Sequence, residues 1–534
     1  MTDSDRLEDS PGRGTVAGRF VEWGLGLRLE DVPEVVREAA KRHLVDALGC
    51  AMAAASTRVP AVEVARGLGG PPEATILGSH RSGLADSRTG AGDKDRGAES
   101  GAAGLGGAEM VGLGGQGGVA EGGADSGGSG VAAWAPKGGV GLGAGVPSGG
   151  VGPGEPSGGV GVGGGRVGGL GAALANGVLM HTLDFDDTHA AALVHASAPV
   201  WATALAVGEE VGACGEEVLL AAVVGLEVIC RLGAAVPHGF HARGLHATSI
   251  CGVIAAALVA ARLYGLPYER AVDALGVSGS QAGGLLEFLH TGSSTKQLHP
   301  GFAAQGGILA ARLARAGATG PDSVIEGRFG LYGALLGRAG VDPGGGLGER
   351  WETSRITIKP YPACQLLHAA LDAAAQVVPA GIVTEVVVEV HADAAAIVCG
   401  EGKDRPRTPY DAKFSLPWSV AAMLVDGEVT VGTYADMGRE DLAELAGKVR
   451  HEVVDLPGVA ADQPGVVRVR FADGSEVVGR VGRSSGGPDD PDLDGLVRRK
   501  ARANGLSDHA VELAMGIESL SSLRPLMAAC GEAL

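Results

Sequence analysis

The sequence predicts a mainly α-helical protein with a smaller α+β unit, and three observations support this prediction. Hydrophobic residues make up 45% of the 534 residues, but aromatic residues only 4%. A core of alanine, valine and leucine suits close helix packing better than a β-sandwich. Helical periodicity fills most of the chain, whereas alternation with a period of two is confined to one later stretch.

The helical elements are expected in two long regions. Residues 15–57 show apolar positions at helical spacing, and further apolar helices are expected from residue 168 to about 348. One of these contains the apolar run 250–261, which is too short to span a bilayer. This run predicts a buried helix that begins near Thr248, with Thr248 or Ser249 as its cap.

A segment of low complexity separates these two regions. The chain contains 93 glycines, and they are concentrated within residues 82–167. Such a composition buries too little apolar surface to offset its chain entropy, so we expect a disordered surface insertion. Its glycine strings lack the ending of a phosphate loop and do not join a strand to a helix, so they predict no nucleotide cofactor.

The pattern changes near residue 356. Residues 384–398, 428–434 and 466–481 alternate as strands do, and residues 472–475 form the turn of a hairpin. Helical stretches lie between them, which predicts an α+β unit. The chain is helical again from residue 488 and is expected to pack back on the first region. The expected boundaries are 15–81, 168–353 and 488–534 for the helical domain, 82–167 for the insertion and 354–487 for the α+β domain.

Charge and cysteine content restrict the class of protein. The net charge of −19 argues against nucleic acid and against an anionic membrane as partner. Seven cysteines are scattered without a CxxC pair, which indicates reduced thiols and neither a disulfide framework nor a zinc ribbon. The acidic N-terminus does not resemble a signal peptide. We therefore expect a cytoplasmic protein.

The densest set of titratable groups lies in residues 176–199. This segment holds His181, Asp184, Thr188 and His195, together with further acids and histidines. On a helix, His181 and Asp184 would share a face, and so would Asp184 and Thr188. So many titratable groups in one place indicate chemistry. The alternative is a solvated acidic helix end, which the interleaved apolar residues disfavour.

Four further loci carry reactive side chains. The first locus is His246, which precedes an apolar helix. The other three are Lys296 together with His299, then Lys359, and then Trp418. Each residue alone has an ordinary structural interpretation, such as a surface histidine or a solvated lysine. Together, lysines would neutralise the carboxylates of a small polycarboxylate substrate, and a histidine would move a proton next to a carboxylate. Asp184 would orient a histidine or act as a base.

A metal site is the alternative for the first segment. Its histidines and aspartates have the donor types of a ligand cluster, and the candidate ligands are His181, Asp184, Asp187, His189 and His195. Lysines rarely share the inner shell of a metal with such ligands. We therefore expect no metal and no other cofactor.

Five ordered motifs carry a resemblance to a known family. They are NGVLMHTLDFDDTH, GLHATSICG, TKQLHPGFAAQGG, KPYPAC and FSLPWSVA. In this order they resemble the MmgE/PrpD family, which includes 2-methylcitrate dehydratases, cis-aconitate decarboxylases and iminodisuccinate epimerases. The resemblance implies a large all-helical domain from both chain ends, a smaller α+β lid, a homodimer, an active site between the domains, and no metal. It also implies roles for the matching residues, which are Asp184, Thr188, His195, His246, Lys296 and Lys359.

The last motif departs from the family. In the cis-aconitate decarboxylase branch of the family that this chain resembles, a tyrosine stands where this chain has Trp418. Tryptophan offers no ionisable hydroxyl. We therefore expect a hydro-lyase that resembles 2-methylcitrate dehydratase, with Lys296, Lys359, His299 and Trp418 at the substrate. The alternatives are an epimerase or decarboxylase that uses the same pocket, and a helical scaffold without activity.

Overall fold

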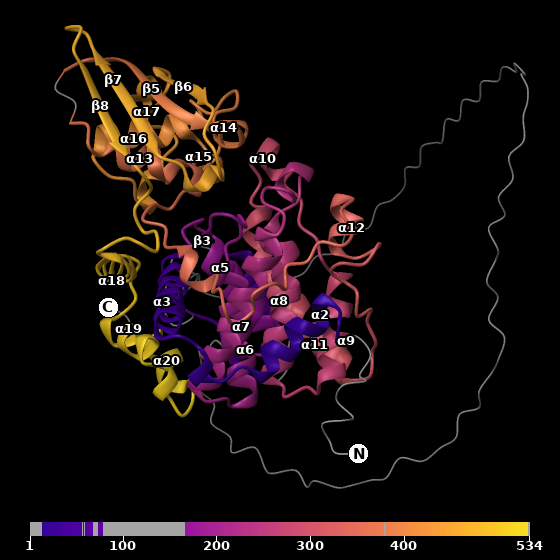
Figure 1. Ribbon diagram of the computed structural model, residues 1–534. Coiled ribbons are helices and arrows are strands. Elements are labelled where there is room, and N and C mark those ends of the chain that lie inside the picture. The colour runs from indigo at the N-terminus through magenta and orange to yellow at the C-terminus, as the bar shows by residue number, and fades with distance from the viewer. Residues whose placement is uncertain are drawn as a thin grey trace, which may run out of the picture. The chain divides into compact units, whose positions relative to one another are not determined.

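The structure is a computed structural model, and Figure 1 shows its helices and strands. The described residues are 13–55, 57, 59–67, 73–77, 166–378 and 381–531. Most of their regular structure is helical, as the sequence predicts. The expected insertion 82–167 lies outside the described residues except at its end. There, β2 (Arg166–Val167) pairs antiparallel with β1 (Ala74–Thr75).

Long apolar helices form the centre of the helical part and lie side by side in the magenta region of Figure 1. They are α5 (Gly169–His181), α6 (Ser197–Val211), α7 (Gly215–Ala234), α8 (Ala247–Leu263) and α11 (His299–Arg315). Glycines let their axes approach closely. A Cβ at Gly307 of α11 would lie 2.4 Å from the Cβ of Ala256 in α8. This close approach explains how a core with few aromatic side chains is filled.

The buried helix predicted around residues 250–261 is α8, but its expected cap is wrong. The helix begins at Ala247, and its N-cap is His246, without a capping bond from that side chain. The Thr248 hydroxyl instead accepts a hydrogen bond of 3.0 Å from the backbone N–H of His195. The side chain expected to cap the helix therefore fixes the segment that carries the acids.

The two ends of the described chain meet on one side of the helical part. The N-terminal helices are α2 (Val16–Gly26) and α3 (Glu34–Ala55), and the C-terminal helices are α18 (Leu493–Ala503), α19 (Asp508–Met515) and α20 (Arg524–Ala529). Helices α18 and α19 pack on α3, where yellow meets indigo in Figure 1. A buried ion pair of 2.6 Å joins Lys500 of α18 to Asp46 of α3. The predicted return of the C-terminal helices is confirmed.

The α+β part contains a four-stranded sheet with the order β6-β5-β7-β8. The strands are β5 (Val383–His391), β6 (Val449–Val454), β7 (Gly465–Phe471) and β8 (Glu476–Val481). Only β5 and β6 are parallel. Helix α13 (His368–Ala374) packs on β7 and β8, and α16 (Leu416–Asp426) packs on β6 and on α17 (Glu440–Ala446). This part has a hydrophobic core of its own.

The strand predictions are correct in part. The hairpin at residues 466–481 is confirmed, with Phe471 and Ser475 bonded across its turn. The strand predicted at 384–398 ends at His391, and α14 (Ala392–Val398) follows, because an alanine-rich stretch favours helix. The strand predicted at 428–434 is wrong, since its residues Val431–Tyr434 form a 3₁₀ turn.

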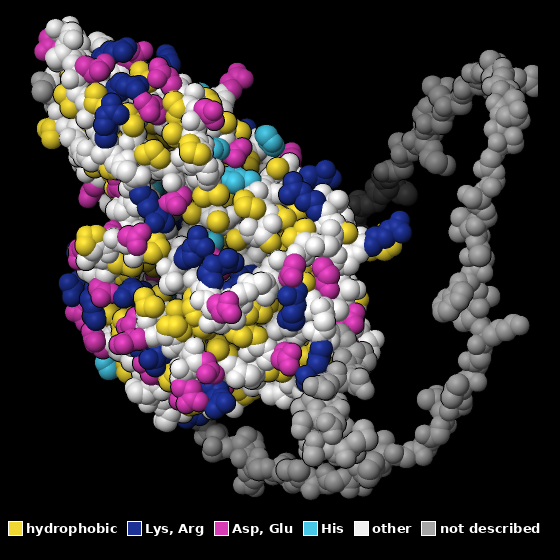
Figure 2. All heavy atoms as spheres, in the orientation of Figure 1, with side chains coloured by type: hydrophobic (Ala, Val, Ile, Leu, Met, Phe, Trp, Pro, Cys, Tyr) yellow, Lys and Arg dark blue, Asp and Glu magenta, His cyan; other side chains and the backbone are white. Residues whose placement is uncertain are grey.

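Further α-helices and strands complete the described part of the chain. They are α4 (Pro60–Gly67), α9 (Tyr268–Gly279), α10 (Phe288–Thr291), α12 (Leu331–Leu336), α15 (Pro409–Ala412), and the antiparallel pair β3 (Thr188–His189) and β4 (Ile356–Thr357). The boundaries given above for the domains stay predictions. Acidic and basic side chains are interspersed over the face seen in Figure 2. Among the described residues, we find no helix with the length and apolar character needed to cross a membrane.

Candidate active site

The segment between α5 and α6 carries the acids and histidines predicted from the sequence. Helix α5 ends at His181, and Asp184 adopts a φ of 52°, in the left-handed region that few residues other than glycine enter. Thr188 then begins β3. The prediction that His181, Asp184 and Thr188 share a helix face is therefore wrong. The chain turns out of the helix before it reaches Asp184.

Lysines from distant parts of the chain hold this turn. Lys413 donates to the carbonyl of Leu183 at 2.8 Å, Lys359 to that of Asp184 at 2.7 Å, and Lys500 to that of Phe185 at 2.6 Å. Three successive carbonyls thus accept from ammonium groups and not from the N–H groups of a continuing helix. Charge-assisted bonds of this kind are stronger than neutral ones, which stabilises the left-handed turn.

Asp184 is fully buried and stands between two lysines. Its carboxylate accepts a short hydrogen bond from Lys296 and lies 3.2 Å from the ammonium nitrogen of Lys359. His195 Nε2 is 3.7 Å from the same carboxylate. Burial alone would raise the pKa of the Asp184 carboxyl, but the ammonium groups of Lys296 and Lys359 hold that pKa well below its usual range. Asp184 is therefore an anion at neutral pH.

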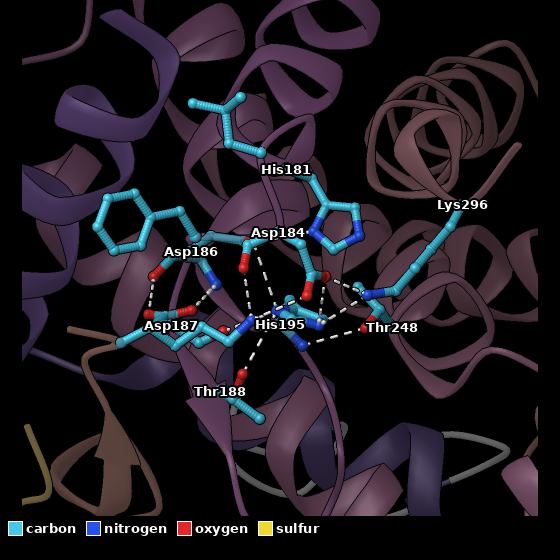
Figure 3. A network of polar contacts seen from close by, with 12 residues as sticks. His181, Asp184, Asp186, Asp187, Thr188, His195, Thr248 and Lys296 are labelled. Carbon is cyan, nitrogen blue, oxygen red and sulfur yellow. Dashed lines mark hydrogen bonds and ion pairs between the residues drawn. The ribbon is translucent and has the colours of Figure 1, made fainter. Parts of the chain in front are cut away.

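His195 is oriented by the backbone, as Figure 3 shows. Its Nδ1 lies 3.0 Å from the carbonyl oxygen of Asp187 and 3.4 Å from the Thr188 hydroxyl. A carbonyl oxygen only accepts, so Nδ1 carries a proton and donates it. On the other side of the ring, Nε2 lies 3.4 Å from the ammonium nitrogen of Lys296. In the neutral imidazole, Nε2 is therefore the basic atom, next to a proton donor.

Two neighbouring acids in the segment have partners of their own. Asp186 lies 2.9 Å from Nδ1 of His181 and 3.4 Å from Nδ1 of His195. Asp187 accepts from the hydroxyl of Ser197 at 2.5 Å and lies 2.8 Å from His43. Burial outweighs the attraction of Asp186 and lowers the pKa of His181 to about 4, so His181 is neutral at neutral pH.

The second histidine group lies at the start of α8. His246 Nδ1 is 3.0 Å from His299 Nδ1, and both side chains are buried. Burial and the nearby Lys296 ammonium lower the pKa of His246 well below its usual value. Burial also lowers the pKa of His299 to about 4 and that of His241 to about 3. These imidazoles are neutral at neutral pH and serve as hydrogen-bonding groups.

A pocket opens beside these groups, with an empty volume of about 530 Å³ that includes its open mouth. Its polar lining is Asp184, Thr188, His195, His241, His246, Lys296, Cys364 and Gln365. Its apolar lining is Leu193, Leu286, Phe288, Leu289, Leu366, Ile397 and Phe414.

The predicted site residues occupy three positions relative to this pocket. Most of them line it, namely Asp184, Thr188, His195, His246 and Lys296. Lys359 is fully buried and bonded to Asp184, and His299 contacts His246, so both stand one layer behind the lining. Trp418 lies apart from the others, in the hydrophobic core of the α+β part, with 1% of its surface exposed.

The ligand cluster considered as the metal alternative does not meet at one point. Asp187 is bonded to Ser197, and His189 is 3.1 Å from Glu352. Instead, His181, His195 and His246 offer ring nitrogens that lie within 4.8 Å of one another. The ammonium of Lys296, 3.4 Å from His195, would repel a cation held there. The expectation of no metal stays a prediction.

Four residues near the site were not predicted as site residues. Lys413 and Lys500 act on backbone carbonyls of the acidic segment, Asp186 links two histidines, and His241 lines the pocket. Burial lowers the pKa of Lys413 to about 7. Lys413 directly precedes the FSLPWSVA motif, and this position was the signal that could have found it. Lys500 lies in an ordinary-looking charged helix and gave no such signal.

A helical body whose pocket joins a buried lysine, aspartate and histidine is equipped for acid–base chemistry on a small molecule. Two family models match this chain, the MmgE/PrpD N-terminal domain over residues 124–343 and the MmgE/PrpD C-terminal domain over residues 361–511. The chain belongs to the MmgE/PrpD family.

Relatives with curated names are similar over much of the chain. A cis-aconitate decarboxylase of Aspergillus terreus is 28% identical over 404 residues, which cover 68% of this chain and 81% of that protein. The cis-aconitate decarboxylase of Homo sapiens is 29% identical over 300 residues, or 53% of this chain and 61% of its own length. That of Mus musculus is 28% identical over 307 residues, with 53% and 60% covered.

Proposed function

We propose that the protein is a cofactor-independent lyase that acts on a small polycarboxylate by moving a proton next to a carboxylate. One observation carries the proposal: the Lys296 ammonium lies between Asp184 and the basic Nε2 of His195, and all three residues line one pocket. Lys296 binds a substrate carboxylate and stabilises the charge that develops on it. His195 takes or returns the proton at Nε2, the ring atom that does not face the Asp187 carbonyl.

The other residues support these two. Asp184 holds Lys296 in place. The Thr188 hydroxyl contacts Nδ1 of His195, the ring nitrogen that also faces the Asp187 carbonyl. Both contacts of Lys359 go to Asp184, so we propose it as a positioning residue and not as a substrate ligand. His246 is a second candidate for the proton transfer, as a neutral imidazole in the lining.

Two reactions fit this set of groups. In dehydration, as in a 2-methylcitrate dehydratase, a base removes the proton next to the carboxylate and the β-hydroxyl leaves as water. In decarboxylation of an unsaturated acid, the carbon–carboxylate bond breaks, its electron pair moves the double bond, and the far carbon takes a proton. The names of the relatives favour decarboxylation over the dehydration expected from the motifs. Epimerisation would use the same proton transfer without loss of a group.

The position of Trp418 bears on this choice. From the sequence, we expect Trp418 at the substrate in place of a tyrosine, which disfavours decarboxylation. A side chain that is 1% exposed in the core of the α+β part does not replace a pocket hydroxyl. The buried position of Trp418 removes this reason against decarboxylation, which becomes our first candidate. The homodimer and the cytoplasmic location stay predictions.

The experiment is an assay of the full chain with cis-aconitate, citrate and 2-methylcitrate, read by product mass and by release of CO₂. His195→Asn is expected to lower turnover by about 10²- to 10⁴-fold. The matched control is His451→Asn, because His451 is exposed on β6, away from the pocket lining. If both variants turn over every accepted acid at the parent's rate, His195 is not the proton-transfer group. Loss of CO₂ identifies decarboxylation, and loss of water identifies dehydration.

A further inference from the structure

The pocket has a second half that the proposed proton chemistry does not use. Five hydrophobic side chains form one continuous surface there, which we call the apolar wall: Leu286, Phe288, Leu289, Ile397 and Phe414. The buried members belong to a hydrophobic cluster that is separate from the two large cores. This cluster therefore lines the pocket and does not merely extend the interior of either part.

The apolar wall comes from both parts of the chain and adjoins the polar groups. Phe288 belongs to α10, whereas Ile397 belongs to α14 and Phe414 follows α15. The Phe288 and Phe414 rings have centroids 6.1 Å apart, and the Lys296 ammonium nitrogen lies 5.0 Å from the Phe414 ring centroid. A carboxylate bound at Lys296 would thus place its carbon chain directly against Phe414.

The charge of the pocket points the same way. Within the described part of the chain, Lys296 is the sole lysine or arginine of the lining, and Asp184 already pairs with it. Two of the three lining histidines, His241 and His246, are neutral at neutral pH because burial lowers the pKa of each. The Lys296 ammonium thus stands with Asp184 and His195, and the apolar wall is left to contact carbon. The pocket suits a polycarboxylate that carries additional carbon.

We infer that the substrate is a carboxylic acid that carries an alkyl chain longer than a methyl group, and that this chain packs on the apolar wall. The inference rests on the proposed function, because it takes the carboxylate to lie at Lys296. Burial of each methylene group on the wall strengthens binding by about fourfold until the wall is covered. Selection among homologous acids would then be set by Leu289, Ile397 and their neighbours.

The test measures the affinity of unreactive analogues by calorimetry. The probes are succinate and its 2-methyl, 2-butyl and 2-hexyl derivatives, with the full-length protein. Affinity is expected to rise by about fourfold per methylene. Leu289→Asn and Ile397→Asn are expected to flatten this rise, because both residues line the pocket and are only partly buried. The matched control is Leu285→Asn, whose side chain is 65% exposed and should leave the rise unchanged.

The outcomes separate this inference from the proposed function. Affinity that stays level or falls with chain length in the parent protein overturns the role of the apolar wall, whether or not cis-aconitate is turned over. A rise that Leu289→Asn and Ile397→Asn leave intact, while both variants melt like the parent, overturns it as well. A rise that these variants abolish supports the wall. In that case, failure of the alkyl-substituted acids to react at all would count against the lyase and not against the wall.

Discussion

Asp184 and Asp187 stand three residues apart in one buried segment, yet they face two different regions of the molecule. Asp184 lines the pocket and pairs with Lys296 and Lys359. Asp187 faces the helical interior, where Ser197 and His43 bind it. The same side chain thus lines a pocket in one region and ties the interior together in the other. The difference is made by the partners that reach each aspartate, and not by its neighbours in the sequence.

The largest expected effect concerns the two lysines that contact the Asp184 carboxylate, Lys296 and Lys359. Lys296→Met is expected to lower kcat/KM by about 10³-fold or more, because it removes the pocket's charge and the donor next to His195. Lys359→Met should mainly destabilise the fold, by about 3–5 kcal/mol, because it leaves a buried anion with one partner fewer. Steady-state kinetics and urea unfolding of both variants measure the contrast. If both variants lose kcat/KM equally and are equally stable, Lys296 and Lys359 do not differ in role.

The next effect concerns the interior aspartate. Asp187→Ala leaves the hydroxyl and N–H of Ser197 and the ring of His43 without their acceptor. We expect a loss of about 3–5 kcal/mol in the free energy of unfolding. The Asp187 carbonyl that holds His195 is retained, so the folded variant should keep kcat/KM within about tenfold. Urea unfolding together with kinetics on the folded fraction checks this. A variant as stable as the parent would show that the interior contacts of Asp187 contribute nothing.

Acid should weaken both regions through buried neutral histidines. Burial lowers the pKa of His181 to about 4 and that of His368 in α13 to about 3, against about 6.5 in the unfolded chain. Between pH 6.5 and 4 the unfolded chain binds these protons and the folded chain does not. The free energy of unfolding therefore falls as the pH falls, by up to about 1.4 kcal/mol per pH unit for each histidine.

Urea unfolding at pH 7.5, 6.0 and 5.0 measures this slope. His181→Gln in the helical part and His368→Gln in the α+β part should each lower the number of protons taken up on unfolding by about one. Each substitution therefore reduces the slope of the free energy of unfolding against pH. A slope that neither substitution changes would mean that both imidazoles are already charged in the folded protein. Since the two histidines are far apart in sequence and in different cores, their effects are expected to add.

The smallest effect is expected at Trp418. Its indole Nε1 is buried without a hydrogen-bonding partner, and the ring fills the core of the α+β part. Trp418→Tyr should change the melting temperature by a few degrees and change kcat/KM by less than about threefold, because the ring does not line the pocket. Calorimetry and kinetics check both values. A hundredfold gain or loss of turnover would show that Trp418 acts at the substrate.

Most of the helical architecture and five of the eight polar residues that line the pocket were predictable from the sequence. Periodicity indicated the long apolar helices, and the ordered motifs indicated Asp184, His195, His246 and Lys296. The backbone at Asp184 was not predictable, because its left-handed turn is held by lysines more than a hundred residues away. Strand β6 escaped prediction because most of its residues are exposed and its valines stand at the two ends, so no apolar alternation marks it.

The apolar wall escaped prediction for a related reason. Its members stand in three separate stretches of sequence, and each looks like an ordinary core residue. Nothing in the spacing of Phe288, Ile397 and Phe414 indicates that they meet beside Lys296. Tertiary packing alone brings this hydrophobic surface to the acid–base groups, and we propose that its apolar character restricts the substrate.

The most direct test of the central claim is turnover in D₂O by protein treated with a chelator, followed by NMR of the product. The account predicts that an accepted polycarboxylate loses CO₂ or water, with proton transfer at the carbon next to or conjugated with a carboxylate. For decarboxylation it predicts one deuterium in the product, formed at an undiminished rate after chelation. Lys296→Met and His195→Asn should lose this product. Turnover that disappears on chelation, or that persists in both variants, would contradict the account.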